Sequence, residues 1–156
     1  MPLKNVQNGK EFGQEMSENM MKFKHLVKNR LPEKVEVVME KNIAESFEKE
    51  TYQDGKSSKW KNRKNDEDPT RKLLIGKGSG KLKRSYEVTR DGTDIKAGSD
   101  LIYAQIHNEG LKGLAFGKHS FTMPKRQVVA KPGQGNAKIN KEVEKWMDNE
   151  MDKIFK

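Results

Sequence analysis

LKRSYEVTRDGTDIKAGS, residues 82–99, is the stretch that decides the predicted fold. Its apolar and polar side chains alternate well enough for two strands, and Asp91-Gly92 supplies the pair of residues that a tight hairpin turn prefers. We therefore predict a β-hairpin over about Leu82–Ala97. This hairpin would nucleate a small antiparallel sheet.

Helices are predicted on both sides of the hairpin. Apolar residues recur every three or four positions from Phe12 to Val27 and again from Ile139 to Ile154, which is the spacing of one helical face. Proline is favoured in the first turn of a helix, so we expect Pro32 to interrupt the first stripe and to start a second helix, which ends near Tyr52. The apolar stripe of this second helix consists of Val35, Val38, Met39, Ile43 and Phe47.

Together these elements predict an α+β fold, in which the small sheet packs against the helices over 35–47 and 139–154. Long irregular loops are expected at about 55–80 and 108–126, followed by a short strand at Val128-Val129. We expect one domain over 32–156, preceded by an N-terminal helical arm over 1–31. The sequence contains no internal repeat, which argues against a solenoid.

The segment LIYAQIHNEG, residues 101–110, contains the most apolar stretch of a polar chain. In an extended chain its odd-numbered residues would share one face, and Ile102, Ala104 and Ile106 would share the other. A helix fits the same residues equally well, because short apolar runs are ambiguous by periodicity. The sequence therefore leaves strand and helix open here.

The composition places the chain near the limit at which burial offsets chain entropy. Hydrophobic residues make up 32%, charged residues 35%, and the mean hydropathy is -1.03, so we expect partial disorder or folding completed by oligomerisation. The absence of cysteine excludes disulfides, thiolate metal sites and cysteine nucleophiles. No apolar run approaches the roughly 20 residues that span a bilayer, and MPLKNVQNGK lacks the apolar middle of a signal peptide. We expect a soluble protein of the cell interior, with no membrane partner.

The net charge of +9 is concentrated in residues 56–90, which hold 12 basic and 4 acidic side chains. Basic side chains release counterions from phosphates, and a tryptophan among them can stack on a base, so the segment 56–84 is a candidate nucleic-acid interface. The same charges suit an acidic protein surface equally well. The candidate contacts are Trp60, Arg63, Lys64, Arg71, Lys72, Lys125 and Arg126.

Other chemistry has little support in the sequence. Gly76–Lys81 reads GKGSGK, but the spacings of a Walker loop and of a dinucleotide fingerprint are both missing. His25, His107 and His119 lack the short spacings of strong zinc motifs. His107 would suit a general base, yet the sequence places no serine or aspartate beside it, so we rank a hydrolase last and expect a hydrogen-bonded structural histidine. We expect no catalytic residue, cofactor or metal.

Several short motifs occur in a definite order. They are NIAESFEKETYQDG (42–55), Trp60, TRKLLIGKGSGKLKRS (70–85), AGSDLIYAQIHNEG (97–110), MPKRQ (123–127) and an amphipathic C-terminal helix. In this order they resemble the phage virion morphogenesis family, whose members are tail-completion proteins. The resemblance covers roughly residues 35–155. It leaves out the helix before Pro32, which we interpret as a lineage-specific arm, and it departs at Val128, where an aromatic residue is expected in many relatives.

The matching positions have a structural interpretation in the first half of the pattern. Phe47 anchors the end of the second helix, and Trp60 offers a large apolar surface that the core or a neighbour should cover. Leu82 and Ser85 begin the first strand of the hairpin. Gly98 then permits the chain to leave it.

In the second half of the pattern, the interpretation concerns packing and turns. Tyr103, Ala104 and Ile106 are expected to pack inward. Gly110 suits a backbone turn out of that segment. Pro124 stiffens the return toward the final helix.

The resemblance implies a non-enzymatic protein that completes the tail or joins head and tail during assembly, as a ring or similar multi-copy assembly. Its partners would be other phage tail or connector proteins and further copies of itself, with DNA in proximity. Its place would be the virion, at the head–tail junction or the tail end, and the host cytoplasm during assembly.

Overall fold

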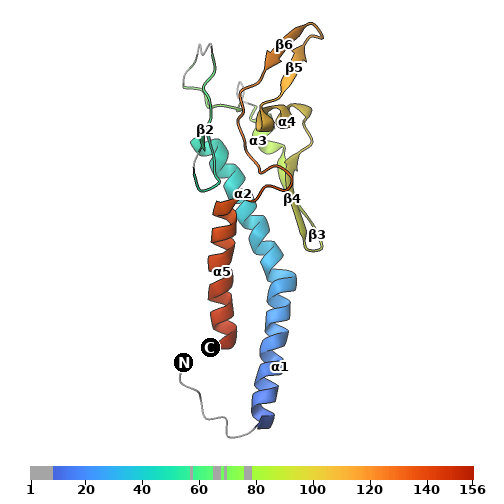
Figure 1. Cartoon of the computed structure of the whole chain (residues 1–156), viewed down its shortest axis with the longest axis vertical. Coiled ribbons are helices and arrows are strands. Elements are labelled where there is room, and N and C mark those ends of the chain that lie inside the picture. The colour runs from blue at the N-terminus through green and yellow to red at the C-terminus, as the bar shows by residue number, and fades with distance from the viewer. Residues whose placement is uncertain (1–8, 57, 65–67, 69, 76–78) are drawn as a thin grey trace.

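The structure, a computed structural model, describes residues 9–56, 58–64, 68, 70–75 and 79–156. The molecule is elongated, and helices form a stalk at one end (Figure 1). Toward the other end, the described residues form three two-stranded antiparallel sheets, in a hairpin region over residues 51–136 (Figure 1). Small sheets packed against helices make this an α+β fold, so the predicted fold class is confirmed.

One long helix runs through the stalk. α1 (Gly9–His25) passes into η1 (Leu26–Arg30), a π-helical turn, and then directly into α2 (Leu31–Lys49) (Figure 1). Pro32 has no amide hydrogen and cannot bond the carbonyl four residues earlier, and the turn before it is widened, with the Leu31 amide bonded to the carbonyl five residues back. The second helix therefore starts where predicted, but as the continuation of the first.

The end of α2 comes slightly earlier than predicted. The helix stops at Lys49 because Glu50 adopts the left-handed conformation with φ 53°, and Thr51–Tyr52 form the short strand β1. β1 pairs antiparallel with β2 (Ser58–Lys59), which lies inside the predicted loop over 55–80.

α5 (Ala137–Phe155) runs back along α2 and part of α1, and α1 extends beyond its C-terminal end (Figure 1). Asn136 caps α5 through its side chain, which accepts hydrogen bonds from the amides of Lys138 and Ile139 at 3.1 Å each. The helix predicted over 139–154 is confirmed. Its apolar residues are half-buried in the seam of the stalk.

Ion pairs join α5 to the long helix. Arg30 of η1 and Lys153 both donate to Glu150, and Lys138 donates to Glu45 of α2. The hydrogen bond from Lys153, followed by that from Arg30, lowers the pKa of Glu150, and the hydrogen bond from Lys138 lowers the pKa of Glu45. Both carboxylates therefore stabilise the folded stalk when they are ionised.

A pH dependence of stability follows from these shifts. A carboxyl whose pKa is lowered on folding contributes stability above its unfolded pKa and loses it as the pH falls through the folded value. We expect Glu150→Gln to lower the thermal unfolding temperature at pH 7 and to have a diminishing effect as the pH falls below about 4.5, the ordinary pKa of the group. Glu144→Gln, an exposed site on the same helix, is the control and should have little effect throughout. If the difference in unfolding temperature between wild type and Glu150→Gln stays constant with pH, this role of Glu150 is contradicted.

The predicted hairpin is present but lies a few residues further along the chain. β3 (Tyr86–Asp91) and β4 (Asp94–Ser99) pair antiparallel, with Asp91 opposite Asp94. Gly92 has the positive φ of the two-residue turn, 62°, whereas Asp91 remains in the strand. Gly98 lies inside β4 and does not lead the chain out of the hairpin, so that prediction is wrong.

The expectation that Leu82 and Ser85 begin the first strand is also wrong. After Gly80, which has φ 54°, the chain makes a short helix, α3 (Lys81–Arg84), that buries Leu82. Ser85 directly follows this helix. Its hydroxyl donates a hydrogen bond to the Leu82 carbonyl at 2.8 Å and lies 2.7 Å from the hydroxyl of Ser99. Ser85 thus connects α3 to the end of the hairpin.

The segment that the sequence left open is helical. α4 (Ile102–Glu109) places Ala104 in the interior, with 3% of its surface exposed, and Ile106 half-buried. Tyr103 is 40% exposed, so the expectation that it packs inward is wrong. Adjacent residues of a helix point about 100° apart, and burial of Ala104 turns its neighbour outward.

The predicted loop over 108–126 contains a second hairpin, which the sequence interpretation missed. β5 (Lys112–Ala115) pairs antiparallel with β6 (His119–Thr122). After it, residues 123–136 return to the stalk without regular structure, and we call them the return segment. Val128-Val129 lies there and forms no strand, contrary to the prediction.

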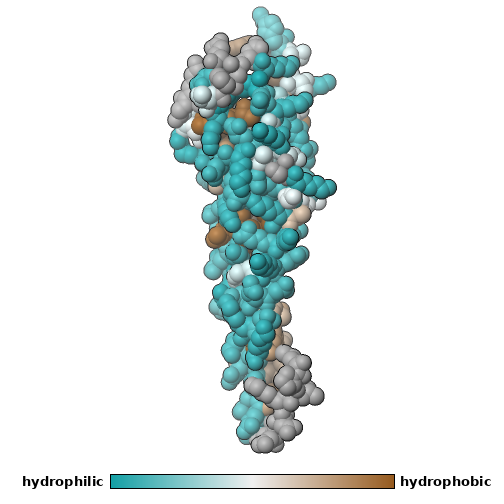
Figure 2. Space-filling view, turned by 90° about the vertical axis from the view of Figure 1, so that its left-hand side faces the viewer, coloured by the Kyte–Doolittle hydropathy of each residue, from teal (hydrophilic) through white to brown (hydrophobic). Residues whose placement is uncertain are grey.

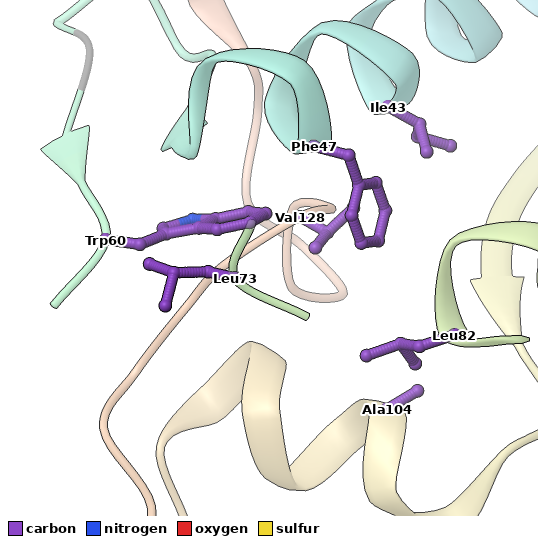
Figure 3. Close-up of a cluster of buried hydrophobic side chains, with 7 residues drawn as sticks. All are labelled: Ile43, Phe47, Trp60, Leu73, Leu82, Ala104 and Val128. Atoms are coloured by element: carbon purple, nitrogen blue, oxygen red, sulfur yellow. The ribbon is translucent and has the colours of Figure 1, made fainter. Parts of the chain in front are cut away.

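A hydrophobic core holds the hairpin region against the upper end of α2. Phe47 and Trp60 meet edge to face with ring centroids 5.7 Å apart, and Val128, which is fully buried, lies beside them (Figure 3). The predicted role of Phe47 at the end of the second helix is confirmed. The core cluster consists of Ile43, Phe47, Trp60, Leu73, Leu82, Ala104 and Val128.

Among the glycines of the motifs that resemble the phage virion morphogenesis family, we expect Gly110 to be the least tolerant of substitution. It ends α4 with φ 71°, and a Cβ there would lie 2.8 Å from Lys125 Cβ and 3.0 Å from Lys125 Cα. We expect Gly110→Ala to cost about 2 kcal/mol of unfolding free energy, measured by urea denaturation. Gly133→Ala shares a positive φ of 76° without a close neighbour and should cost less, whereas Gly98→Ala should be nearly neutral. Equal effects of all three would refute the close-contact explanation.

Candidate functional site

Trp60 is not available to stack on a base. It is 4% exposed, its indole Nε1 donates to the carbonyl of Gln127 at 2.8 Å, and its amide donates to the carbonyl of Glu50 at 2.8 Å. These bonds connect the end of α2, the segment after β2 and the return segment. Trp60 is therefore a core residue, and its assignment as a nucleic-acid or partner contact is wrong.

Arg63 has a structural role in the basic segment. Its guanidinium donates to the carbonyl oxygens of Arg71 at 2.8 Å and Lys72 at 2.7 Å, which closes the loop between them. The Lys72 ammonium donates in turn to the carbonyl of Glu48 at 3.2 Å. Arg63 thus stabilises its own loop, and Lys72 connects that loop to α2.

The remaining predicted contacts separate into two groups. Lys64 and Lys125 are exposed, whereas Arg126 is 6% exposed and donates from Nε to the carbonyl of Lys61 at 2.9 Å. The structure brings Arg63, Arg71 and Arg126 together around one pocket of about 300 Å³, which His107 also lines. Lys64, Lys72 and Lys125 do not line it.

Among the described residues that line this pocket, no acid accompanies His107. Burial, followed by the positive charge of Arg126, lowers the pKa of His107. Its Nδ1 atom is buried and has no hydrogen-bond partner among the described residues, so the expectation of a hydrogen-bonded ring is not met at that atom. Within the described ranges, no three His, Asp or Glu residues lie together as potential metal ligands.

An exposed apolar surface lies along α1 and the start of η1. Phe12 is 49%, Met16 42%, Met20 53% and Val27 38% exposed, although they recur at the spacing of one helical face. We call these four residues the α1 stripe. The face shown in Figure 2 is mostly hydrophilic, with separate hydrophobic patches. Because an apolar helical face normally packs against another element, the α1 stripe is a candidate protein contact.

A second exposed apolar site lies at the β5–β6 hairpin. Leu114 is 66% exposed, and Phe116, in the turn with φ 53°, is 95% exposed. The sequence interpretation did not identify it, since the segment was assigned to a loop. The available signal was an aromatic residue, Phe116, directly before Gly117.

A groove of about 700 Å³ separates the stalk from the hairpin region. The groove is bounded by α2, β4, α4, the return segment and the start of α5. Many of the side chains that line it are apolar, including Val35, Met39, Ile95 and Ile139. The groove places an apolar surface between the two ends of the molecule. Among the described residues, no helix combines the length and apolar character that crossing a bilayer requires.

Comparison with known proteins adds the family to this geometry. The sequence profile of the phage virion morphogenesis family matches residues 10–154 of the 156-residue chain. The chain belongs to this family. No curated protein and no solved structure gives a significant match. As a member of the phage virion morphogenesis family, the protein has a role in phage assembly and is expected to contact other virion proteins.

The family match also changes the interpretation of the N-terminal helix. It begins at residue 10 and so includes α1, which the resemblance in the sequence left out. The helix therefore belongs to the part of the chain that the virion morphogenesis family shares. Its exposed apolar stripe becomes the first candidate for a contact with another virion protein.

Proposed function

We propose that this protein is a non-enzymatic tail-completion or head–tail joining protein that works as several copies in contact. Its place in the virion is the head–tail junction or the end of the tail. Its partners are further copies of itself and other tail or connector proteins. The family supports the assembly role, and the exposed surfaces of the chain support the multi-copy contacts.

The observation that carries the proposal is the α1 stripe. Phe23 continues the same face and is half-buried, because its ring lies 6.3 Å from that of Phe155 on α5. Nearer the start of α1, the helix extends beyond α5 and Met16 and Met20 remain exposed (Figure 1). Burying such a face against a second copy would stabilise the contact by about 25 cal/mol for each Å² of apolar surface removed from water. Joining proteins need contact surfaces of this kind and no reaction centre.

Light scattering coupled to size exclusion tests the multi-copy contact. We expect the wild-type protein to form oligomers and Met16→Lys/Met20→Lys to shift it to monomers, since two charges would be placed in the contact. The matched control is Gln14→Lys/Met21→Lys, which adds the same charge on the opposite face of α1. A wild-type monomer at every concentration, or equal effects of both double variants, would contradict the α1 contact.

The assembly step is tested in the phage itself. Deletion of the coding sequence should leave heads and tails that fail to join or tails that lack their terminal structure, which electron microscopy of lysates would reveal. Supplying the wild-type protein should restore virions, and supplying Met16→Lys/Met20→Lys should not. Normal virions in the deletion strain would overturn the proposed function.

A further inference from the structure

A cationic pocket lies between the basic segment and α4, apart from the apolar surfaces described above. It has a volume of about 300 Å³, and its charged lining consists of Arg63, Arg71, Lys81 and Arg126, joined by His107. None of the described residues that line it is acidic. Like charges repel when they share a partly buried site, so a ligand that carries negative charge would stabilise this arrangement of cations.

Donor groups in this pocket lack partners. Arg71 Nε and His107 Nδ1 are buried and make no hydrogen bond with any described residue. Arg126 is 6% exposed, and its side chain is bonded to the described residues only through Nε, which donates to the Lys61 carbonyl. Buried polar groups are normally satisfied, so Arg71 Nε, and His107 Nδ1 in the tautomer protonated at that atom, are suited to donate to the acceptor oxygens of a ligand.

The pocket is also held in place. Arg63 is fixed by its bonds to the carbonyls of Arg71 and Lys72, and the Arg126 amide donates to the His107 carbonyl at 2.8 Å. Burial and then the charge of Arg63 lower the pKa of Arg126, which reflects a positive local potential. Glu50, whose negative charge raises the pKa of Arg126, accepts a hydrogen bond from the Leu73 amide and is not among the described residues that line the pocket.

We infer that the pocket formed by Arg63, Arg71, Arg126 and His107 binds a phosphate group. A carboxylate offers two oxygens and one negative charge, whereas a phosphate offers more acceptor oxygens and close to two charges, which suits several guanidinium donors better. The phosphate source is either a free phosphate ion or the backbone of a nucleic acid. This inference concerns a different site from the α1 contact, so either can fail alone.

Titration followed by NMR tests the inference directly. The probe is sodium phosphate, with sodium acetate as the carboxylate comparison and sodium chloride to hold ionic strength constant. We expect phosphate to shift the Arg71 Nε and His107 ring signals in a saturable way and acetate to do so far more weakly. Equal responses to phosphate and acetate, or no saturable response, would overturn the inference.

Variants assign the binding to the pocket. Arg71→Gln keeps the backbone carbonyl that Arg63 uses but removes the unpartnered donor, and should weaken phosphate binding about tenfold or more. Arg90→Gln, an equal change of charge on β3, is the control and should bind as the wild type does. Lys81→Gln, at an exposed pocket position, provides a second test if Arg71→Gln fails to fold. Unchanged affinity in the folded pocket variants would overturn the site.

A duplex oligonucleotide distinguishes the two phosphate sources. If the DNA backbone occupies the pocket, sodium phosphate at constant ionic strength will compete with the duplex, and Arg71→Gln will weaken duplex binding more than Arg90→Gln does. If the ligand is a free phosphate ion, both variants will bind the duplex equally, and only the phosphate titration will respond to Arg71→Gln. Both results support the phosphate site and differ only in the source.

Discussion

Trp60→Ala is expected to lower the free energy of unfolding by about 3–5 kcal/mol, which is the usual cost of truncating a buried tryptophan. The side chain is 4% exposed, packs edge to face on Phe47, and holds the carbonyl of Gln127 through its indole nitrogen. Loss of the ring would leave a cavity between α2 and the return segment, and Gln127 would lose its hydrogen bond. Urea denaturation followed by circular dichroism measures the change.

Two further tryptophan variants separate packing from hydrogen bonding. Trp60→Phe keeps an aromatic ring but removes the donor to Gln127, and should cost about 1–3 kcal/mol for the unsatisfied carbonyl. Trp146→Phe, on the half-buried seam of α5, should cost less and leaves Trp60 as the sole tryptophan for fluorescence. A loss below about 1 kcal/mol for Trp60→Ala would mean that the ring is not part of the core.

Asn108→Ala is expected to be the other strongly destabilising change, costing about 3 kcal/mol through unsatisfied buried groups. The Asn108 side chain accepts hydrogen bonds from the amides of Val128 at 2.7 Å and Val129 at 3.1 Å, and donates to the Val129 carbonyl at 3.1 Å. The Asn108 side chain therefore satisfies backbone hydrogen-bonding groups of Val128 and Val129 that a neighbouring strand would otherwise pair with. No other element pairs with the return segment at this point among the described residues.

Hydrogen exchange gives this prediction a local readout. In Asn108→Ala, the Val128 amide should exchange faster than amides of α5, because its bond is lost directly. Gln105→Ala on the exposed face of α4 is the control and should change stability by less than about 0.5 kcal/mol. Unchanged protection of the Val128 amide would show that Asn108 does not hold the return segment.

The sequence predicted the elements whose signals are local. Apolar periodicity was sufficient to predict the helix that ends near Phe47 and the helix that starts near Ile139, because each helix presents one apolar face to a neighbour. Gly92 located the β3–β4 turn to within a few residues, since a two-residue hairpin needs a positive φ. The β5–β6 hairpin escaped detection because residues such as Leu114 and Phe116 are exposed, and an unburied hairpin carries no alternating pattern.

The candidate sites were harder to predict because they depend on contacts distant in sequence. Trp60 was assigned to a surface by its basic neighbours, yet its partner Gln127 lies 67 residues away. Arg126 and Arg63 meet at one pocket from opposite ends of the hairpin region. Exposure of the α1 stripe could not be read from periodicity either, because an amphipathic pattern does not reveal whether a second element covers it.

The π-helical turn at Leu26–Arg30 sets the direction in which the lower helix presents its apolar side. A hydrogen bond that spans five residues accommodates one residue more than an α-helical turn, and each residue corresponds to an angular offset of about 100°. Deleting one residue there would rotate Met16 and Met20 around the axis relative to Phe47 while leaving their chemistry intact. The five residues of η1, next to Pro32, therefore determine the direction in which Met16 and Met20 face relative to the hairpin region.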